Sequence, residues 1–440
     1  MDATEEGALS RKLTVGVLAA AVAIAAVVFA GLAGSARSAA KVTQLPSSSC
    51  TPMVYKGSGS PDYIIASDLP LQGAIRHQTL EINRAVIWAL QDLGWKAGPY
   101  KIGYQSCDDS TAQSAGWDTA KCATNAHLYA SDRSVIGVVG TFNSGCAEIE
   151  VPVLNRANPG PLAMVSPANT APGLTTTGPG ASPGEPNKYY PTGVRNYARV
   201  VANDQYQGAA DAMFTQSLGV KKVYVLNDKQ TYGVGVSTTY VGAAKKLGIS
   251  ILADQGWDAK QTSYEALAEA IKKSGAQLVF LGGIVCNNGA LLMKNIKAVD
   301  PKIKLQMPDG FSDPSANGSV ANGAYISVAG EPPSKLTGKG ATFVKQFSKS
   351  IGQEANPYAA YGAEATEVLL SAIARSGGNR ADVAKALFGM NVANSILGSF
   401  TINSQGDTSG AAVTIYKQTG TATSDLSPVT TLTPPTSLVK

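Results

Sequence analysis

The feature that most constrains the fold is an alternation of short apolar segments with amphipathic ones, which occurs twice along the chain. In the first series, the apolar side chains of residues 82–93 recur at the three- and four-residue spacing of a helix. The apolar segments of that series are 63–67, 100–105, 135–140 and 162–166, and those of the second series are 221–227, 249–253 and 277–283. Strands that alternate with helices pair in parallel and are covered by helices on both faces. We therefore predict an α/β protein with two doubly wound parallel-sheet lobes.

The segments after the second series indicate that the chain returns to both lobes. A helix near 358–376 and strands near 396–417 come too late to belong to the second series alone. We expect lobe 1 to consist of residues 60–190 and 335–390, and lobe 2 of residues 191–334 and 391–420.

Two further stretches are predicted to lie outside regular structure. Residues 171–187 are rich in Gly, Pro and Thr, which predicts a linker or a long surface loop. Residues 421–440 are rich in Thr, Ser and Pro and are expected to form a disordered tail.

The amino-terminal segment indicates export. Arg11 and Lys12 precede an uncharged run from 13 to 34, and the small residues at 38–40 fit a signal-peptidase site before Lys41. The alternative is a membrane helix that is retained as an anchor, since the run is long enough to span a bilayer. In both cases residues 1–40 direct the rest of the chain out of the cytoplasm, to the periplasm or the outer face of the cell membrane.

Charge and motifs exclude several classes of function. The net charge of +5 is spread along the chain without a block of Lys and Arg, so a nucleic-acid partner is not expected. The chain has 2 His residues, far apart in sequence, and no metal site is expected. Gly233 and Gly235 begin a GxGxxG pattern, but Thr238 replaces its third Gly. No phosphate-binding loop and no nucleophile elbow occur, so we expect neither an enzyme nor a cofactor.

The five cysteines of an exported chain are candidates for disulfide bonds. We expect Cys107, at the end of a predicted strand, to pair with Cys122 in the helix that follows, while Cys107 with Cys146 is the competing pair. Asp108 and Asp109 are expected to cap the helix that contains Cys122.

Small polar residues follow two strands of the first lobe at the point where each strand ends. Ser144 comes after 135–140, and Thr170 comes after 162–166. Ligands of an open parallel sheet lie beyond the carboxyl ends of its strands. Hydroxyls and free backbone N–H groups at a helix start suit a carboxylate, although both residues are equally compatible with ordinary caps or turns.

Six stretches, taken in order, carry a resemblance to a known family. They are VIGVVGTFNS (135–144), VSPANTAPGLT (165–175), LNDKQTYGVGV (226–236), LVFLGG (278–283), PYAAYGAEA (357–365) and ILGSFTINSQGD (396–407). Together they resemble type I periplasmic binding proteins, and most closely the leucine/isoleucine/valine-binding branch. The resemblance covers roughly residues 60–420. It implies two lobes joined by three crossovers, a ligand in the cleft between them, and delivery of that ligand to an ABC permease.

The resemblance also implies a ligand site. Ser144 and Thr170 would donate hydroxyls to the ligand carboxylate, and Ala168 would offer its backbone to the α-amino end. Tyr232 would close over the ligand, and Asp309 stands where the family has a Glu that pairs with the ammonium. The alternatives are a core aromatic for Tyr232 and a turn residue for Asp309.

The side-chain pocket departs from the family. Gln72 stands where branched-chain binders have an aromatic residue, and Ile284 stands where they have a Tyr. The expected ligand is an amino acid, with a branched-chain one as the first choice, or a related small amide. The other function left open is a ligand-sensing receptor ectodomain of the same fold that acts through a partner.

Overall fold

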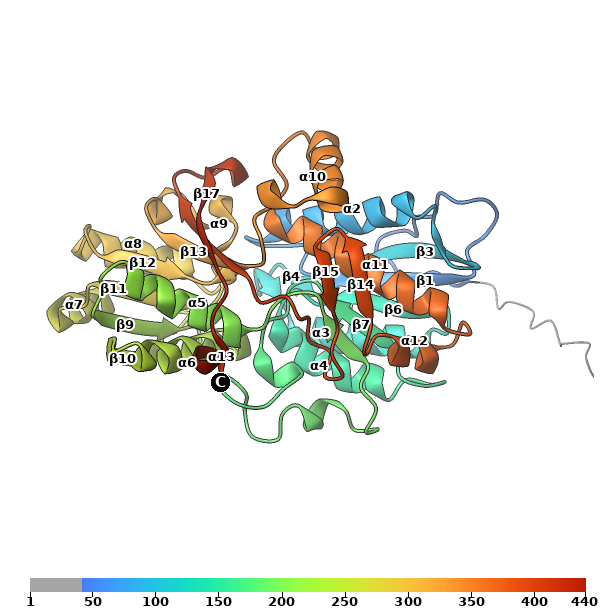
Figure 1. Ribbon diagram of the computed structural model, residues 1–440, viewed down its shortest axis with the longest axis horizontal. Helices are drawn as coiled ribbons and strands as arrows, with labels where there is room; N and C mark the ends of the chain where they lie inside the picture. The colour runs from blue at the N-terminus through green and yellow to red at the C-terminus, as the bar shows by residue number, and fades with distance from the viewer. Residues whose placement is uncertain (1–41) are drawn as a thin grey trace, which may run out of the picture. The chain divides into compact units, whose positions relative to one another are not determined.

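The computed structural model describes residues 42–440, so the predicted signal peptide or anchor at 1–40 lies outside the described residues. Within that range, none of the helices combines the length and the apolar character that a membrane span requires. The elements of this part of the chain form two open sheets, each covered by helices (Figure 1).

The first sheet has the strand order β2-β3-β1-β6-β7-β8. Its strands are β1 (Tyr63–Leu69), β2 (Lys96–Ala97), β3 (Tyr100–Asp108), β6 (Val135–Gly140), β7 (Ala163–Ser166) and β8 (Tyr197–Arg199). All neighbours pair in parallel except β2, which is antiparallel to β3. A separate short ribbon, β4 (Ser110–Thr111) with β5 (Gly116–Trp117), follows β3.

The period of two along β1 divides its side chains between two layers of helices. Ile64 and Ala66 belong to a buried cluster that also contains residues of α3 (Thr119–Ser131) and α4 (Ser144–Asn155). Ile65 belongs to the cluster that contains residues of α2 (Arg76–Asp92) and α11 (Pro357–Arg375). The predicted parallel sheet with helices on both faces is therefore what the first lobe forms.

The second sheet has the strand order β10-β9-β11-β12-β13-β16-β17. Its strands are β9 (Lys222–Asn227), β10 (Ser250–Gly256), β11 (Leu278–Gly282), β12 (Lys304–Met307), β13 (Tyr325–Ala329), β16 (Val413–Gln418) and β17 (Leu426–Leu432). Its helices are α5 (Asp204–Ser217), α6 (Thr231–Lys246), α7 (Glu265–Ser274), α8 (Gly289–Val299) and the short α9 (Pro314–Asn317). Val223 and Val225 pack with α5 and α6, while Tyr224 and Leu226 share the cluster of α7 and α8.

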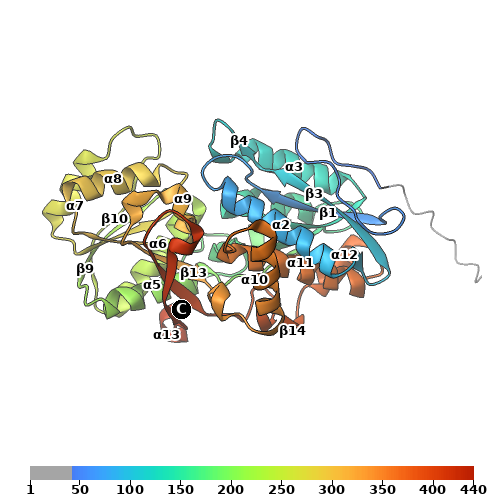
Figure 2. The same ribbon diagram turned by 90° about the horizontal axis from the view of Figure 1, so that it is seen from above.

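The chain passes between the two sheets three times. It leaves β8 for α5, and it leaves β13 for α10 (Gly338–Ile351), α11 and α12 (Arg380–Ala386). After the hairpin of β14 (Asn391–Ser395) and β15 (Gly398–Thr401) it returns to β16. Helices α2 and α11 lie side by side (Figure 2), although more than 200 residues separate them in sequence.

The predicted lobe boundaries differ from the structure at two places. Strand β8 belongs to the first sheet, so the first crossing lies after 199 and not at 190. The hairpin β14–β15 contacts α10, so it stays with the first lobe although it lies beyond 390. Neither shift has a sequence signal, because a three-residue strand and an exposed hairpin are both too short to show a period.

Residues 421–440 are not a disordered tail, so that prediction was wrong. Strand β17 pairs antiparallel with β16, and α13 (Thr436–Val439) packs against α5 and α6. Pro428 lies within β17, which is the edge strand of its sheet, where a missing N–H breaks no interior ladder. The Pro and Thr content that indicated disorder therefore reflects an edge strand.

The predicted Cys107–Cys122 disulfide was also wrong. Cys50 pairs with Cys107, and Cys122 pairs with Cys146, while Cys286 is free. The segment before β1 runs antiparallel beside β3, which places Cys50 opposite Cys107. Cys122 lies on α3, which packs against α4 and so meets Cys146.

Asp108 and Asp109 do not cap α3 as expected. The cap is Asp118, whose carboxylate accepts hydrogen bonds from the N–H groups of Ala120 and Lys121 at 3.0 and 3.1 Å. The short ribbon β4–β5 separates β3 from the helix, so the helix starts later in the chain than Asp109.

Candidate functional site

Residues at the carboxyl ends of five strands line one small cavity. Phe142, Asn143 and Ser144 follow β6, Ala168 follows β7, Tyr232 follows β9, Ile284 follows β11, and Asp309 and Gly310 follow β12. The first two strands belong to the first sheet and the other three to the second. Because both sheets point their carboxyl ends at this cavity, it is the place where a ligand of this fold is expected.

Five of the seven predicted site residues line the cavity, namely Ser144, Ala168, Tyr232, Ile284 and Asp309. Phe142, Asn143 and Gly310 line it as well and were not predicted. Phe142 and Asn143 directly precede Ser144 in the sequence, and this proximity is the signal from which they could have been predicted.

Thr170 and Gln72 are not among the lining residues. Thr170 is buried next to the crossing into α5, and its carbonyl accepts the Asp204 N–H at 2.8 Å. The Gln72 amide donates to the Asp108 carboxylate at 2.8 Å and to the Ser110 carbonyl at 3.2 Å. Gln72 therefore holds the loop after β1 against the end of β3, and it does not line the cavity of the described conformation.

Asp309 supplies a buried carboxylate to the cavity. The hydroxyls of Tyr232 and Tyr358 each donate a hydrogen bond to it, one to each carboxylate oxygen. Burial raises the pKa of Asp309, and the two tyrosine hydroxyls offset part of that rise. No Lys, Arg or His lies among the residues that line the cavity within 42–440. A ligand ammonium or amide N–H would give this carboxylate the strong donor that it otherwise lacks.

The start of α4 gives the cavity an end of opposite character. Asn143 is the N-cap residue of this 12-residue helix, and Ser144 is its first residue. The first N–H groups of a helix have no partner within the helix and carry partial positive charge. The Ser144 hydroxyl accepts a hydrogen bond from the Ala171 N–H at 3.3 Å, which fixes the side chain between the ends of β6 and β7. Hydroxyl and N–H groups at one end and a carboxylate at the other match a zwitterion.

The remaining lining side chains are mainly apolar. Phe142 packs edge-on against Tyr358, with ring centroids 5.6 Å apart, and Ile284 is buried at the end of β11. The cavity leaves about 20 Å³ for the centre of a water molecule. That is room for roughly one water, since about 10–15 Å³ by this measure holds one. The described conformation is therefore closed, and a ligand of amino-acid size needs the lobes to separate.

Hydrogen bonds across the cleft hold this closed form. Thr231 of α6 donates to Glu148 of α4 at 3.0 Å, and Gln78 of α2 donates to Ser312 after β12 at 2.8 Å. Both bonds join a residue of the first lobe to a residue of the second, as does the bond from Tyr358 to Asp309. Burial raises the pKa of Glu148, and its hydrogen bonds with Tyr189 and Thr231 act in the other direction.

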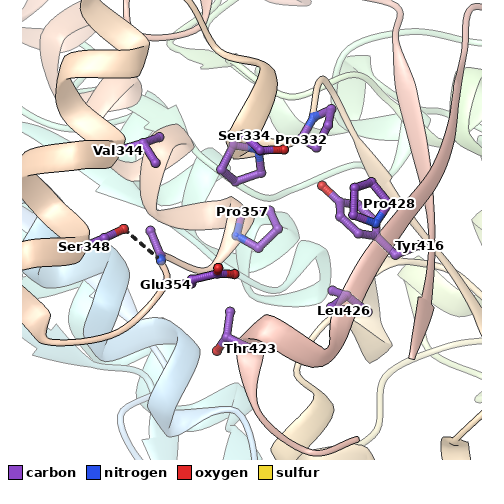
Figure 3. A pocket seen from close by; sticks show the side chains of 12 residues that line it. Pro332, Ser334, Val344, Ser348, Glu354, Pro357, Tyr416, Thr423, Leu426 and Pro428 are labelled. Atoms are coloured by element: carbon purple, nitrogen blue, oxygen red, sulfur yellow. Dashed lines mark hydrogen bonds between the residues drawn. The ribbon is translucent and has the colours of Figure 1, made fainter. Parts of the chain in front are cut away.

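A larger hollow of about 180 Å³ lies at the second crossing and is a weaker candidate for the solute site. Its walls are Pro332, Ser334, α10, the start of α11 and strand β17 (Figure 3). The Ser348 hydroxyl is occupied by the N–H of Ala355 at 3.2 Å, and Glu354 is exposed. This hollow offers no buried charge to fix a ligand.

Two groups of buried side chains have the composition of a metal site, but their sulfurs are not available. The groups are Asp109 with Cys122 and Cys146, and Asp68 with Cys146 and Glu150. Because Cys122 and Cys146 form a disulfide, neither can act as a thiolate ligand. Neither group retains three ligands as it stands.

Comparison with known proteins gives a consistent match. The sequence model of a family described as periplasmic binding protein matches residues 69–424. A Leu/Ile/Val-binding protein homolog 3 from Brucella melitensis is 27% identical over 286 residues, which is 64% of this chain and 72% of that protein.

Two solved structures show the same fold. The leucine-binding protein LivK from Thermotoga maritima has a TM-score of 0.73 at 20% identity and covers 84% of this chain and 99% of its own. A solute-binding protein of an ABC transporter from R. palustris in complex with benzoate has a TM-score of 0.68 at 17% identity, with coverages of 84% and 96%. Similar folds thus hold ligands of different chemistry.

Proposed function

Because the chain belongs to the periplasmic binding protein family, whose members bind solutes and are not enzymes, we propose that it captures an amino acid between its lobes for an ABC importer. The observation that carries the proposal is the shared cavity. Asp309 and Tyr232 from the second lobe and Ser144 and Ala168 from the first line it together.

The two ends of the cavity favour a zwitterion. The ligand carboxylate would bind at Ser144 and the first N–H groups of α4, and the ammonium would bind at Asp309. Charge-assisted hydrogen bonds of this kind are shorter and roughly twice as strong as neutral ones. Thr170, which the resemblance placed at the carboxylate, does not line the cavity, so Ser144 takes that role alone among the predicted hydroxyls.

The apolar side of the cavity favours an aliphatic side chain. Phe142 and Ile284 supply it, and a branched-chain amino acid is the first candidate for a ligand there. A small amide is the second candidate, because an amide N–H can also donate to Asp309. A benzoate-like anion fits less well, since it brings no donor for the buried carboxylate.

Capture requires motion of the lobes. In the open form the ligand would dock on Ser144 in the first lobe, and closure would bring Tyr232 and Asp309 onto it. The closed surface across both lobes would then be the form that an ABC permease recognises. The family relationship supports export of the chain and association with such a permease.

The test is a binding screen by thermal shift followed by titration calorimetry. Leucine, isoleucine, valine, alanine, acetamide, urea and benzoate are compared at equal concentration. We expect an α-amino acid with an aliphatic side chain to raise the unfolding temperature most. Binding of benzoate with no response to any amine or amide would contradict the proposed ligand class, and small-angle scattering without compaction would contradict closure.

A further inference from the structure

Eight exposed lysines gather at the amino ends of the strands of the second sheet. They are Lys221, Lys222, Lys245, Lys246, Lys272, Lys273, Lys302 and Lys304, and together they are named the lysine face. The cavity residues follow the carboxyl ends of β9, β11 and β12. The lysine face therefore lies at the opposite edge of the sheet, away from the ligand.

The sheet register brings these four pairs of lysines together. Lys222 lies beside Ser250 at the start of β10, and Val223 lies beside Leu278 at the start of β11. Leu278 in turn lies beside Lys304 at the start of β12. With about 4.8 Å between neighbouring strands, the starts of these four strands span roughly 15 Å. The charge that looks evenly spread in sequence is concentrated in space.

Little negative charge balances this face. None of the eight lysines forms an ion pair with an Asp or Glu side chain within residues 42–440. Lys246 donates to the backbone oxygens of Ser437 and Lys440, and Lys272 donates to that of Val299. The acids near this edge are Asp254, which lies within electrostatic reach of Lys245, Asp300 at the end of α8, and Glu269, four residues before Lys273 on α7. Eight lysines against three acids leave a positive surface.

The fold itself does not require these lysines. Basic residues in the last turn of α6 and α7 complement the helix dipole, but the equivalent helices of the first lobe, α2, α3 and α4, have none there. Lys221, Lys222, Lys302 and Lys304 are at strand starts, where the dipole offers no explanation. The first lobe also has basic residues before its strands, namely Arg133 before β6, Arg156 before β7 and Arg195 before β8, but these three are arginines, whereas the lysine face consists of lysines alone.

The kind of basic residue indicates the kind of partner. Residues 204–329 contain 12 Lys and no Arg. Protein–protein interfaces are enriched in Arg and depleted in Lys, because the planar guanidinium binds carboxylates at fixed geometry. Flexible ammonium groups suit a diffuse layer of negative charge, as in the clusters of four to eight Lys or Arg, beside a membrane helix or on an amphipathic helix, that bind anionic lipids.

We propose that the lysine face docks on a membrane surface that carries anionic phospholipid headgroups. This contact holds the protein close to the membrane in which its permease lies, independently of the amino-terminal segment and of which solute is bound. The cleft remains free, since it is at the other edge of the sheet.

The experiment measures partitioning of the full chain onto vesicles by co-sedimentation. Vesicles of phosphatidylcholine alone are compared with vesicles in which about one third of the lipid is phosphatidylglycerol. The test variant replaces Lys221, Lys222, Lys272 and Lys273 with Gln. The matched control replaces Lys56, Lys96, Lys345 and Lys349, four exposed lysines of the first lobe, with Gln.

The amino-terminal segment is identical in all three proteins, so any binding that it contributes cancels in the comparison. We expect the parent and the control to prefer anionic vesicles, and the test variant to lose about tenfold or more of that preference. Raising the salt from about 0.05 M to about 0.5 M should remove the preference of the parent, because the screening length falls.

Equal partitioning of parent and test variant would overturn the proposal, as would an equal loss in the control. Salt-sensitive binding to a DNA duplex without binding to anionic vesicles would overturn it too, since the partner would then be a different polyanion. Unchanged thermal unfolding of both variants shows that folding is intact, and unchanged solute binding keeps the result separate from the proposed function.

Discussion

Tyr358 of α11 donates a hydrogen bond to Asp309 after β12, so a side chain of the first lobe holds the buried carboxylate of the second. Tyr232 donates to the other oxygen of the same carboxylate. An ionised carboxylate has about four lone-pair sites, so it can accept more hydrogen bonds than the two that these tyrosines donate. Tyr358 therefore connects closure of the lobes directly to the group proposed to bind the ligand ammonium.

Replacement of Asp309 with Asn should weaken binding of an amino acid by about a hundredfold or more. An unpaired buried ammonium costs about 3–5 kcal/mol, which corresponds to that loss of affinity. Titration calorimetry with the ligand found in the screen measures the change. The matched control is Asp258→Asn, because Asp258 is an exposed acid of the same lobe. An unchanged affinity in the Asp309 variant would mean that this carboxylate is not the ammonium partner.

Replacement of Ser144 with Ala should have a smaller effect. Loss of one hydrogen bond to a charged group costs about 1.5–3 kcal/mol, while the N–H groups of α4 remain. Affinity for the amino acid should fall by about tenfold to a hundredfold. Ser182→Ala, at an exposed position of the first lobe, is the control. If both variants bind alike, the ligand carboxylate is not at the start of α4.

The fold and part of the site could be predicted because their signals are local. The apolar run 135–140 corresponds exactly to β6, and Ser144 follows its end in both the sequence and the structure. The two-lobe resemblance also pointed to Tyr232 and Asp309, which line the cavity. Gln72 does not line it, and the residue type at a loop position does not reveal its partner, here the Asp108 carboxylate.

Features that depend on distant pairing could not be predicted from local patterns. Tyr358 reaches Asp309 across 49 residues of chain, and Cys50 meets Cys107 only because the segment before β1 runs beside β3. Strand β17 lacks a clear apolar period because it is an edge strand. In each case the contact is set by how the sheets assemble.

The disulfide pairing has a direct chemical test. Non-reducing peptide mapping should recover Cys50 linked to Cys107 and Cys122 linked to Cys146. In the chain-entropy model, removing the second bond by Cys122→Ala with Cys146→Ala should lower the unfolding free energy by about 3–4 kcal/mol. Urea unfolding of the oxidised proteins measures that difference. Recovery of Cys107 linked to Cys122 would contradict the structure.

Stability should decrease as the pH rises from weakly acidic values. Burial raises the pKa of Asp211 to about 8 and that of Glu364 to about 7, against ordinary values of 3.8 and 4.5. The folded protein therefore binds more protons than the unfolded chain between about pH 4 and pH 8, and deprotonation in this window favours unfolding. The contribution of these two carboxyl groups to the free energy of unfolding is fully present below their pKa values in the unfolded chain. It is lost as the pH rises through their pKa values in the folded protein.

Urea unfolding at a series of pH values checks this, with Asp211→Asn as the diagnostic variant. Asn keeps an oxygen for the Gln306 amide, which donates to Asp211 at 2.8 Å, but it has no carboxyl group to titrate. The variant should therefore show a shallower decline above pH 5 than the parent does. An identical slope in both proteins would mean that Asp211 is already ionised in the folded state.

The free Cys286 should report opening of the cleft. Cys286 lies just after β11 of the second lobe. A Cβ atom placed on Gly116 of the first lobe would lie 3.7 Å from the Cβ atom of Cys286, so Gly116 covers this cysteine. Burial raises the pKa of Cys286 to about 11, so its thiolate is scarce while the lobes are closed. Separation of the lobes removes the covering residues and lowers the pKa of Cys286 toward its ordinary value.

A maleimide or iodoacetamide at pH 8 should thus modify Cys286 at a rate set by the population of the open form. Saturating solute holds the lobes closed and should slow modification severalfold, while a non-binding amino acid should not. Cys286→Ser is the control that shows no other thiol reacts, since the remaining four cysteines are paired. If the rate with saturating solute equals the rate without it, the lobes do not open and close around the ligand at this edge of the cleft.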